Sequence, residues 1–168
     1  MGTEDKELAS VRLLELEDLP AVYALGESVF TADKWPSLYR TWDEYEPVGL
    51  FHASGEFCFV ADYEDKIAGF ALGSMIEKRN SAWNYGYLTW LAVDPVYKRL
   101  GIATLLLDEI THAFISNGAR MMIVDTDAEN DPAIRFFRRN DFLNEDAHIY
   151  LTKNLTNHPS YKRIRSKL

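Results

Sequence analysis

Residues 91–104 carry the pattern in this sequence that points most directly to chemistry. An aromatic and branched run is followed by the basic pair Lys98 and Arg99 and then by a glycine, Gly101. Amides at the start of a helix lack partners within the helix and carry the positive end of its dipole, so they bind anions. Small residues at Gly101 and Ala103 let phosphate oxygens approach the backbone. The segment predicts a pyrophosphate site, with a tight turn bearing solvated basic residues as the alternative.

The elements that must hold this segment alternate strands and helices. Apolar and branched runs predict strands over residues 11–16, 57–62, 67–75, 85–93, 121–126 and 149–155. Helical spacing and capping residues predict helices over residues 18–30, 103–117 and 131–140. An irregular, aromatic-rich flap is expected over 31–56, with a short helix around 38–45. The continuous apolar run 121–126 is typical of a strand buried on both faces beside a parallel neighbour. This order favours a mixed α/β sheet covered by helices.

The composition suits one domain of ordinary size. The chain has 168 residues, of which 47% are hydrophobic, and the net charge of −8 argues against nucleic acid as a partner. We expect one domain over 1–168 with a basic C-terminal tail at 160–168. Cys58 is the only cysteine and lies in an apolar run, which predicts a buried strand residue. Without an apolar leader or a membrane-length apolar run, we expect a cytoplasmic protein with no membrane partner.

Two blocks of this sequence resemble the GNAT superfamily of N-acetyltransferases. The first family block has Gln or Arg, two residues, Gly, one residue, then Gly or Ala, and Lys98, Gly101 and Ala103 stand at those positions. Lys98 replaces the usual Gln or Arg. The second block runs from Asn130 and matches the residues Asn130, Ala133, Ile134, Arg135, Phe136, Phe137 and Phe142. The resemblance covers nearly the whole chain and is nearest to protein N-terminal acetyltransferases.

This resemblance implies a mostly antiparallel central sheet with a splayed parallel pair, flanked by helices, and acetyl-coenzyme A as cosubstrate. The pantetheine arm would pair with the backbone of Leu91, Ala92 and Val93 as an added strand. An amide of Leu91 or Ala92 would stabilise the oxyanion that develops on the thioester. The other implied cofactor-binding residues are Lys98, Arg99, Leu100, Gly101, Ile102, Ala103 and Thr104 at the phosphates and Asn130, Ala133, Phe136 and Phe137 at the sulfur end.

Direct attack by an amine requires a group that takes a proton from the ammonium. Asp125, which the resemblance places at an acidic position used as base in some protein N-terminal acetyltransferases, is one candidate. Glu77, near the end of a hairpin strand, is the other, and either can equally be a solvated carboxylate. The family's general acid is a tyrosine at the position of Phe137, so the usual acid is absent. The helix dipole, a water or another tyrosine would have to replace it.

The acceptor is expected to be a peptide N-terminus or a small-molecule amine. Flap aromatics such as Tyr39 and Trp42 can receive a cationic amine through cation-π contacts. Tyr85 and Tyr87 share one face of a strand and either line the acceptor wall or carry a water relay, and His148 is a further polar candidate. The alternative is that the flap aromatics only cap the open end of the sheet. A coenzyme A-binding module that has lost transfer activity is a third hypothesis. No metal site is expected, and a homodimer is permitted but not specified.

Overall fold

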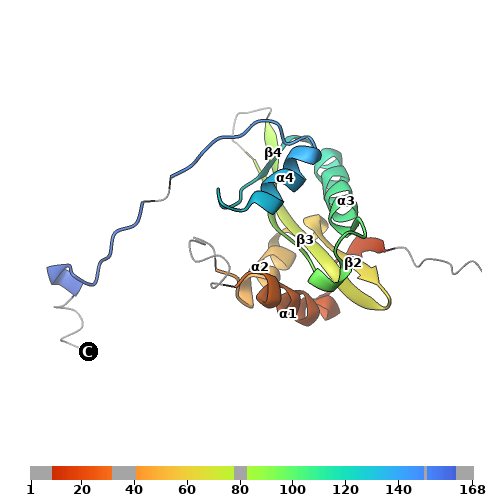
Figure 1. Cartoon of the computed structure of the whole chain (residues 1–168), viewed down its shortest axis with the longest axis horizontal. Coiled ribbons are helices and arrows are strands. Elements are labelled where there is room, and N and C mark those ends of the chain that lie inside the picture. Colours follow the sequence, from red (N-terminus) through yellow and green to blue (C-terminus); the bar gives the residue numbers. More distant parts are fainter. Residues whose placement is uncertain (1–8, 32–40, 78–82, 150, 162–168) are drawn as a thin grey trace, which may run out of the picture. The chain divides into compact units, whose positions relative to one another are not determined.

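A computed structural model of the protein describes residues 9–31, 41–77, 83–149 and 151–161 (Figure 1). The chain divides into two units, residues 1–130 and residues 131–168. The expected single domain over 1–168 stays a prediction, and most of the expected basic tail lies outside the described residues. No helix in the described ranges combines the length and apolar character that crossing a membrane requires.

The first unit is built on a five-stranded sheet in the order β1-β2-β3-β4-β5. Its strands are β1 (Ser10–Leu13), β2 (Cys58–Tyr63), β3 (Lys66–Ile76), β4 (Asn84–Val93) and β5 (Ala119–Val124). Neighbours from β1 to β4 are antiparallel, whereas β4 and β5 are parallel. The mixed, mostly antiparallel sheet with one parallel pair is therefore confirmed.

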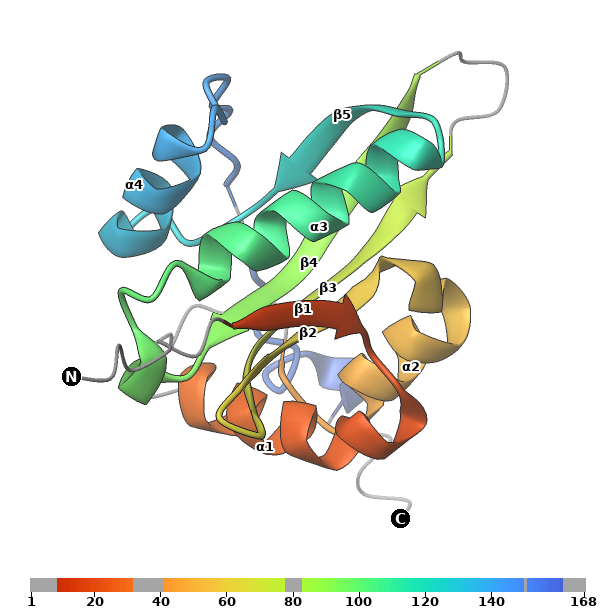
Figure 2. The ribbon, with the colours of Figure 1, turned by 90° about the vertical axis from the view of Figure 1, so that its right-hand side faces the viewer.

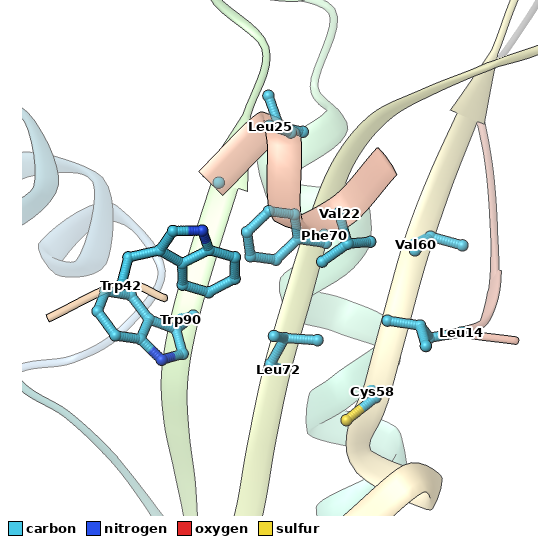
Figure 3. Close-up of a cluster of buried hydrophobic side chains, with 10 residues drawn as sticks. Leu14, Val22, Leu25, Trp42, Cys58, Val60, Phe70, Leu72 and Trp90 are labelled. Carbon is cyan, nitrogen blue, oxygen red and sulfur yellow. The ribbon is translucent and has the colours of Figure 1, made fainter. Parts of the chain in front are cut away.

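One face of this sheet packs against α1 (Leu19–Val29) and α2 (Tyr45–Ser54). Phe70 and Leu72 of β3 and Trp90 of β4 belong to a buried cluster on this face (Figure 3). The ring of Trp42 stacks on Phe70 with centroids 5.4 Å apart and meets Trp90 edge-on at 5.2 Å. The face over which α1 and α2 lie thus has an aromatic core.

The other face carries α3 (Ile102–Ser116), which lies along the sheet (Figure 2). Glycines in the strands allow this close approach. A Cβ added at Gly86 would lie 2.3 Å from the Phe114 ring, and one at Gly73 would lie 2.8 Å from that ring. Residues Ile102, Leu106, Ile110 and Phe114 of α3 are buried. The helix expected over 103–117 is confirmed, and Gly118, at φ 86°, lies two residues after its last residue, Ser116.

Helix α2 corrects the expectation of an irregular flap. The sequence around it contains Pro47, Gly49 and Gly55, which weaken the helical pattern. Leu50 and Phe51 nevertheless pack against the buried cluster, and tertiary packing supplies most of a helix's stability. The short helix expected over 38–45 is not formed by its described residues: 41–43 lie outside any helix or strand, 44 lies in a turn and Tyr45 begins α2, whereas 38–40 lie outside the described residues.

Two strand predictions are also corrected. The segment 121–126 is not buried on both faces, because β5 is the last strand of the sheet and its Met121 is 41% exposed. The closing strand expected over 149–155 is not formed by the described residues of that range, where Ile149 is 85% and Leu151 91% exposed. Alternating apolar residues form a strand only where another strand pairs with them, so the alternation alone was insufficient.

An ion-pair network joins the start of α1 to the sheet. Arg12 of β1 donates to both Asp18 carboxylate oxygens at 2.6 and 2.9 Å, and its Nε donates to Asp62 of β2 at 2.6 Å. Asp18 also accepts the Glu15 amide at 2.8 Å. Asp18 does stand at the predicted N-cap, but its side chain makes no cap hydrogen bond to α1. Arg12 lowers the pKa of Asp18 below its ordinary value.

Candidate functional site

The site begins where β4 separates from β5. Their parallel pairing ends at Leu88 with Val124, although β4 continues to Val93 beside β3. On the β3 side, Leu72 pairs with Trp90 and Gly73 pairs with Leu88, so Thr89 is an extra residue that forms a bulge. A bulge bends its strand and increases the local twist. The bulge therefore coincides with the point at which the parallel pair opens.

Beyond the bulge, one edge of β4 pairs with no strand among the described residues. Leu91, Ala92 and Val93 lie on this stretch, with Ala92 buried and the other two half-buried. A free strand edge presents unpaired N–H and C=O groups that an extended ligand can bind as another strand. The structure thus places the three residues at an edge suited to the role expected of them.

The turn after β4 is held to the sheet by backbone contacts. The Asp94 amide donates to the Ala68 carbonyl at 2.8 Å, and the Asp94 carboxylate accepts the Val96 amide at 2.9 Å. The short helix η3 (Pro95–Tyr97) follows, and the Tyr97 ring meets Tyr63 at 5.3 Å. These contacts fix where the chain enters α3.

The start of α3 has the geometry of an anion site. Arg99 and Gly101 adopt positive φ values of 69° and 79°, and the Gly101 carbonyl accepts the amides of Thr104 and Leu105 at 3.0 and 3.1 Å. The amides of Ile102 and Ala103 therefore precede the first intrahelical bonds. Ile102 is 1% exposed and anchors the helix, whereas Lys98, Arg99, Leu100 and Thr104 are exposed.

Glycine is favoured at position 101 because of its backbone conformation and not because a side chain would be crowded there. A Cβ added at Gly101 would meet no atom within 4 Å, so the space above it is open. Its left-handed φ is one that residues with a side chain rarely adopt. The exposed turn thus combines a left-handed glycine, adjacent backbone amides and the Lys98 and Arg99 charges, which fits a pyrophosphate.

A carboxylate lies at the opening of the parallel pair. The Tyr87 hydroxyl of β4 donates to the Asp125 carboxylate at 2.6 Å. Asp125 directly follows β5, and Tyr87 pairs with Ile123 of that strand. Tyr85 is half-buried on the same face of β4, two residues earlier.

Glu77 lies farther from this opening. It follows β3 by one residue, is exposed, and stands beyond the last β3–β4 pair, Ile76 with Tyr85. Tyr87 pairs with Ser74, three residues before Glu77, which is about 10 Å along a strand. Of the two predicted bases, Asp125 is the one at the splay.

The loop after β5 is ordered by its own polar side chains. The Asn130 side chain donates to the Thr126 hydroxyl at 3.0 Å, and the Asn130 amide donates to the Asp127 carbonyl at 3.0 Å. The Asp127 carboxylate accepts the Glu129 amide at 2.8 Å. Asn130 is thus held at the end of the first unit.

The second unit contains α4 (Asp131–Arg139). Phe137 is 9% exposed, with its ring 5.2 Å from both Phe136 and Phe142. Ala133 is half-buried. The position of the expected tyrosine is therefore occupied by an apolar cluster within α4 and the turn after it.

The acceptor-binding candidates differ in where they lie. Trp42 is 7% exposed and its indole N–H donates to the Tyr23 carbonyl at 3.0 Å, which favours the alternative of a capping core residue. Tyr39 lies outside the described residues. His148 lies in the second unit, exposed and outside any helix or strand.

Sequence reasoning missed one contact near this site. The Trp90 indole N–H donates to the Glu46 carboxylate at 2.8 Å. Nothing in the local sequence distinguishes Glu46 from the neighbouring acidic residues, because its partner is 44 residues away. Cys58 is fully buried as predicted, and burial raises the pKa of its thiol to about 12, so the thiol takes no part in chemistry here.

Comparison with known proteins adds family information to this geometry. The sequence profile described as "Acetyltransferase (GNAT) family" matches residues 19–142. N-alpha-acetyltransferase 30 of Schizosaccharomyces pombe is 30% identical over 105 residues, which cover 62% of this chain and 69% of the yeast protein. The Xenopus laevis protein of the same name is 22% identical over 83% of this chain, and the match spans 44% of its length. The chain therefore spans less than half of that frog relative.

Solved structures show the same fold. An aminoglycoside N-acetyltransferase, AAC(6')-Iy in complex with CoA, superposes with a TM-score of 0.72 and 19% identity, covering 90% of this chain and 99% of that one. A chain of the NatC complex bound to Gag peptide and CoA gives a TM-score of 0.68 at 15% identity, covering 92% of each chain. At these identities the likeness concerns the fold alone.

Proposed function

Because this chain belongs to the acetyltransferase (GNAT) family, we propose that it transfers an acetyl group from acetyl-coenzyme A to a primary amine. The observation that carries this proposal is the edge of β4 that no described strand pairs with, which runs into the open helix start at Gly101. Acetyl-coenzyme A supplies the activated thioester. The chain supplies the binding edge, the anion site and a carboxylate at the splay.

The proposed binding residues follow the two parts of this surface. The amides at the start of α3, with Lys98 and Arg99, hold the pyrophosphate, and the exposed Leu100 and Thr104 border it. The edge formed by Leu91, Ala92 and Val93 pairs with the pantetheine arm. Asn130, Ala133, Phe136 and Phe137 remain proposed binding residues from the family block alone.

Asp125 is the proposed general base. Its carboxylate lies where β4 and β5 separate and is oriented by the Tyr87 hydroxyl. A carboxylate held there can accept a proton from an ammonium group, leaving the amine free to attack. Glu77 is the less favoured base because it lies beyond the last paired residues of β3 and β4. An amide of Leu91 or Ala92 is the proposed oxyanion donor.

Phe137 supplies no proton, so the departing thiolate is not protonated from that position. A thiolate is a stable leaving group at neutral pH compared with an alkoxide or an amide, and transfer therefore does not require a side-chain acid. Loss of the tyrosine also keeps a coenzyme A-binding protein without transfer activity as the alternative function.

The acceptor is proposed to be a peptide N-terminus or a small-molecule amine. The similarity to N-alpha-acetyltransferase 30 favours a peptide, whereas the fold is shared with an aminoglycoside N-acetyltransferase. We expect a cytoplasmic protein with no nucleic acid or membrane partner. The exposed aromatic residues Tyr45 and Trp83 permit a homodimer.

Thiol release from acetyl-coenzyme A, measured with a panel of peptides and polyamines, tests the function. Replacing the base by Asp125→Asn should lower kcat roughly 100-fold or more at pH 7, with coenzyme A affinity nearly unchanged. Glu77→Gln is the matched control and should retain activity. Unchanged turnover in Asp125→Asn would remove Asp125 from the mechanism. Binding of coenzyme A without thiol release for any acceptor would establish the binding-protein alternative.

A further inference from the structure

Glu46 links helix α2 to the central strand at the opening of the parallel pair. Its Oε2 accepts the Trp90 indole N–H at 2.8 Å. A buried indole N–H needs an acceptor, and Trp90 is only 4% exposed. The Glu46 side chain is half-buried. The carboxylate is therefore held in place over β4 rather than free to rotate in solvent.

Strand register places Trp90 and Tyr87 on the same face of β4. Trp90 pairs with Leu72 and Tyr87 pairs with Ser74, two residues farther along β3. Residues two apart in a strand share a face and are about 7 Å apart. The bulge at Thr89 makes this possible, because without it Tyr87 and Trp90 would point to opposite faces. Both side chains lie on the face covered by α1 and α2.

Each of these aromatic residues binds one carboxylate. Tyr87 binds Asp125, and Trp90 binds Glu46. Asp125 directly follows β5 and its carboxylate accepts the Tyr87 hydroxyl, so the carboxylate lies on the Tyr87 face. Two carboxylates from distant parts of the chain are thus held by adjacent aromatic donors at the splay.

The charge of Glu46 is not neutralised by a basic side chain of the described ranges, where the ion pairs involve other carboxylates. The neighbouring residues Asp43 and Glu44 are also acidic. A carboxylate beside an active face, without a cation from the described part of the protein, favours a cation on the ligand.

We propose that Glu46 determines acceptor specificity by binding a second cationic group of the acceptor, while the amine to be acetylated lies at Asp125. This inference rests on the proposed acetyl transfer. Glu46 is unsuited to bind the reacting amine itself, because a second carboxylate would stabilise the ammonium and oppose deprotonation. The spacing of about 7 Å between Tyr87 and Trp90 suits an acceptor whose two cationic groups are separated by a short chain.

A pair of acceptors that differ by one charge tests this role. With acetyl-coenzyme A, the wild type should use 1,5-diaminopentane with a lower KM than pentylamine. Glu46→Gln retains an oxygen that accepts the Trp90 N–H but loses the charge. It should raise the KM for 1,5-diaminopentane roughly tenfold, leave its kcat within about twofold, and leave both constants for pentylamine unchanged.

Glu44→Gln is the matched control, because it removes the same charge two residues before Glu46 without removing the contact between Glu46 and Trp90. It should leave the preference for the diamine intact. Equal KM changes with both acceptors, or equal effects of the two variants, would overturn the role of Glu46. Trp90→Phe removes the N–H that positions Glu46 and should also weaken the preference for the diamine over pentylamine. An unchanged preference would contradict the positioning of Glu46 by Trp90.

Calorimetry separates failure of this inference from failure of the proposed function. If the wild type releases no thiol with any acceptor, the transfer reaction is refuted. The Kd of 1,5-diaminopentane for the protein then tests the role of Glu46 without turnover. We expect weaker binding to Glu46→Gln and unchanged binding to Glu44→Gln. Equal binding to all three proteins would overturn the inference.

Discussion

Replacing Gly101 by alanine adds one methyl group at the proposed phosphate site. Gly101 has a φ of 79°, and a Cβ there meets no protein atom within 4 Å. The substitution therefore creates no clash within the protein, and its effect on folding comes from the backbone alone. Any further effect on coenzyme A binding must come from a ligand that occupies the open space.

The two effects have different expected sizes. A residue with a Cβ in the left-handed region costs roughly 1–2 kcal/mol, part of which is offset because alanine restricts the unfolded chain. Forcing a phosphate away from the helix start costs roughly 1–3 kcal/mol by analogy with overpacked contacts. That second cost corresponds to about a fivefold to 150-fold rise in Kd.

The far end of the same helix supplies the control. Gly118 has a φ of 86° and also meets nothing within 4 Å, so Gly118→Ala carries the same backbone cost without touching the phosphate site. Urea unfolding should give similar losses of stability for both variants. Calorimetric titration with coenzyme A should show a raised Kd for Gly101→Ala only.

Coenzyme A affinity that is unchanged in Gly101→Ala would refute the location of the phosphate site. An equal loss of affinity in both variants would attribute the effect to the helix as a whole rather than to the space above Gly101. A stability loss much larger in Gly101→Ala than in Gly118→Ala would contradict the absence of crowding at Gly101.

Two further predictions concern stability. Gly26→Ala should lower the free energy of unfolding by roughly 1–3 kcal/mol, because its Cβ would lie 2.1 Å from the Trp42 ring. In the control Gly49→Ala, the added Cβ meets nothing within 4 Å, so the change should be neutral or stabilising. Equal melting temperatures of the two variants would contradict the packing argument. Asp18→Asn should cost about 1 kcal/mol at pH 7 after allowance for solvent screening, because Arg12 lowers the pKa of Asp18 and stabilises its charged form. This contribution is present above the ordinary pKa of about 4 and is lost as the pH falls through the lowered pKa, so urea unfolding of the two proteins should converge in acid; a difference independent of pH would contradict it.

The sequence by itself predicted the proposed phosphate site and the strands around it. Strand β4, the turn, Gly101 and α3 are consecutive, so local signals suffice to find them: a branched and aromatic run, a glycine and helical spacing. The same holds for the antiparallel β2–β3 hairpin and for the parallel partner of β4. Asp125 was predicted as a candidate base from the resemblance to the family, and this role remains a proposal.

Other features depended on contacts between residues far apart in the chain. Helix α2 forms because Leu50 and Phe51 reach the buried cluster, although its own glycines and proline disfavour a helix. Trp42 was expected to be a candidate for acceptor binding, but its burial on Phe70 is decided by packing. The alternation in residues 149–155 predicts a strand that the described residues do not form, because pairing is not encoded by one strand alone.

The placement of the two carboxylates shows the limit most clearly. Sequence alternation alone would put Tyr87 and Trp90 on opposite faces of β4, since they are an odd number of residues apart. The bulge at Thr89 reverses that parity, and it is visible only in the register with β3. The sequence determined which residues can bind an anion or accept a proton. The tertiary structure decided that Asp125 and Glu46 share one face, because register and helix packing, not local propensity, bring them there.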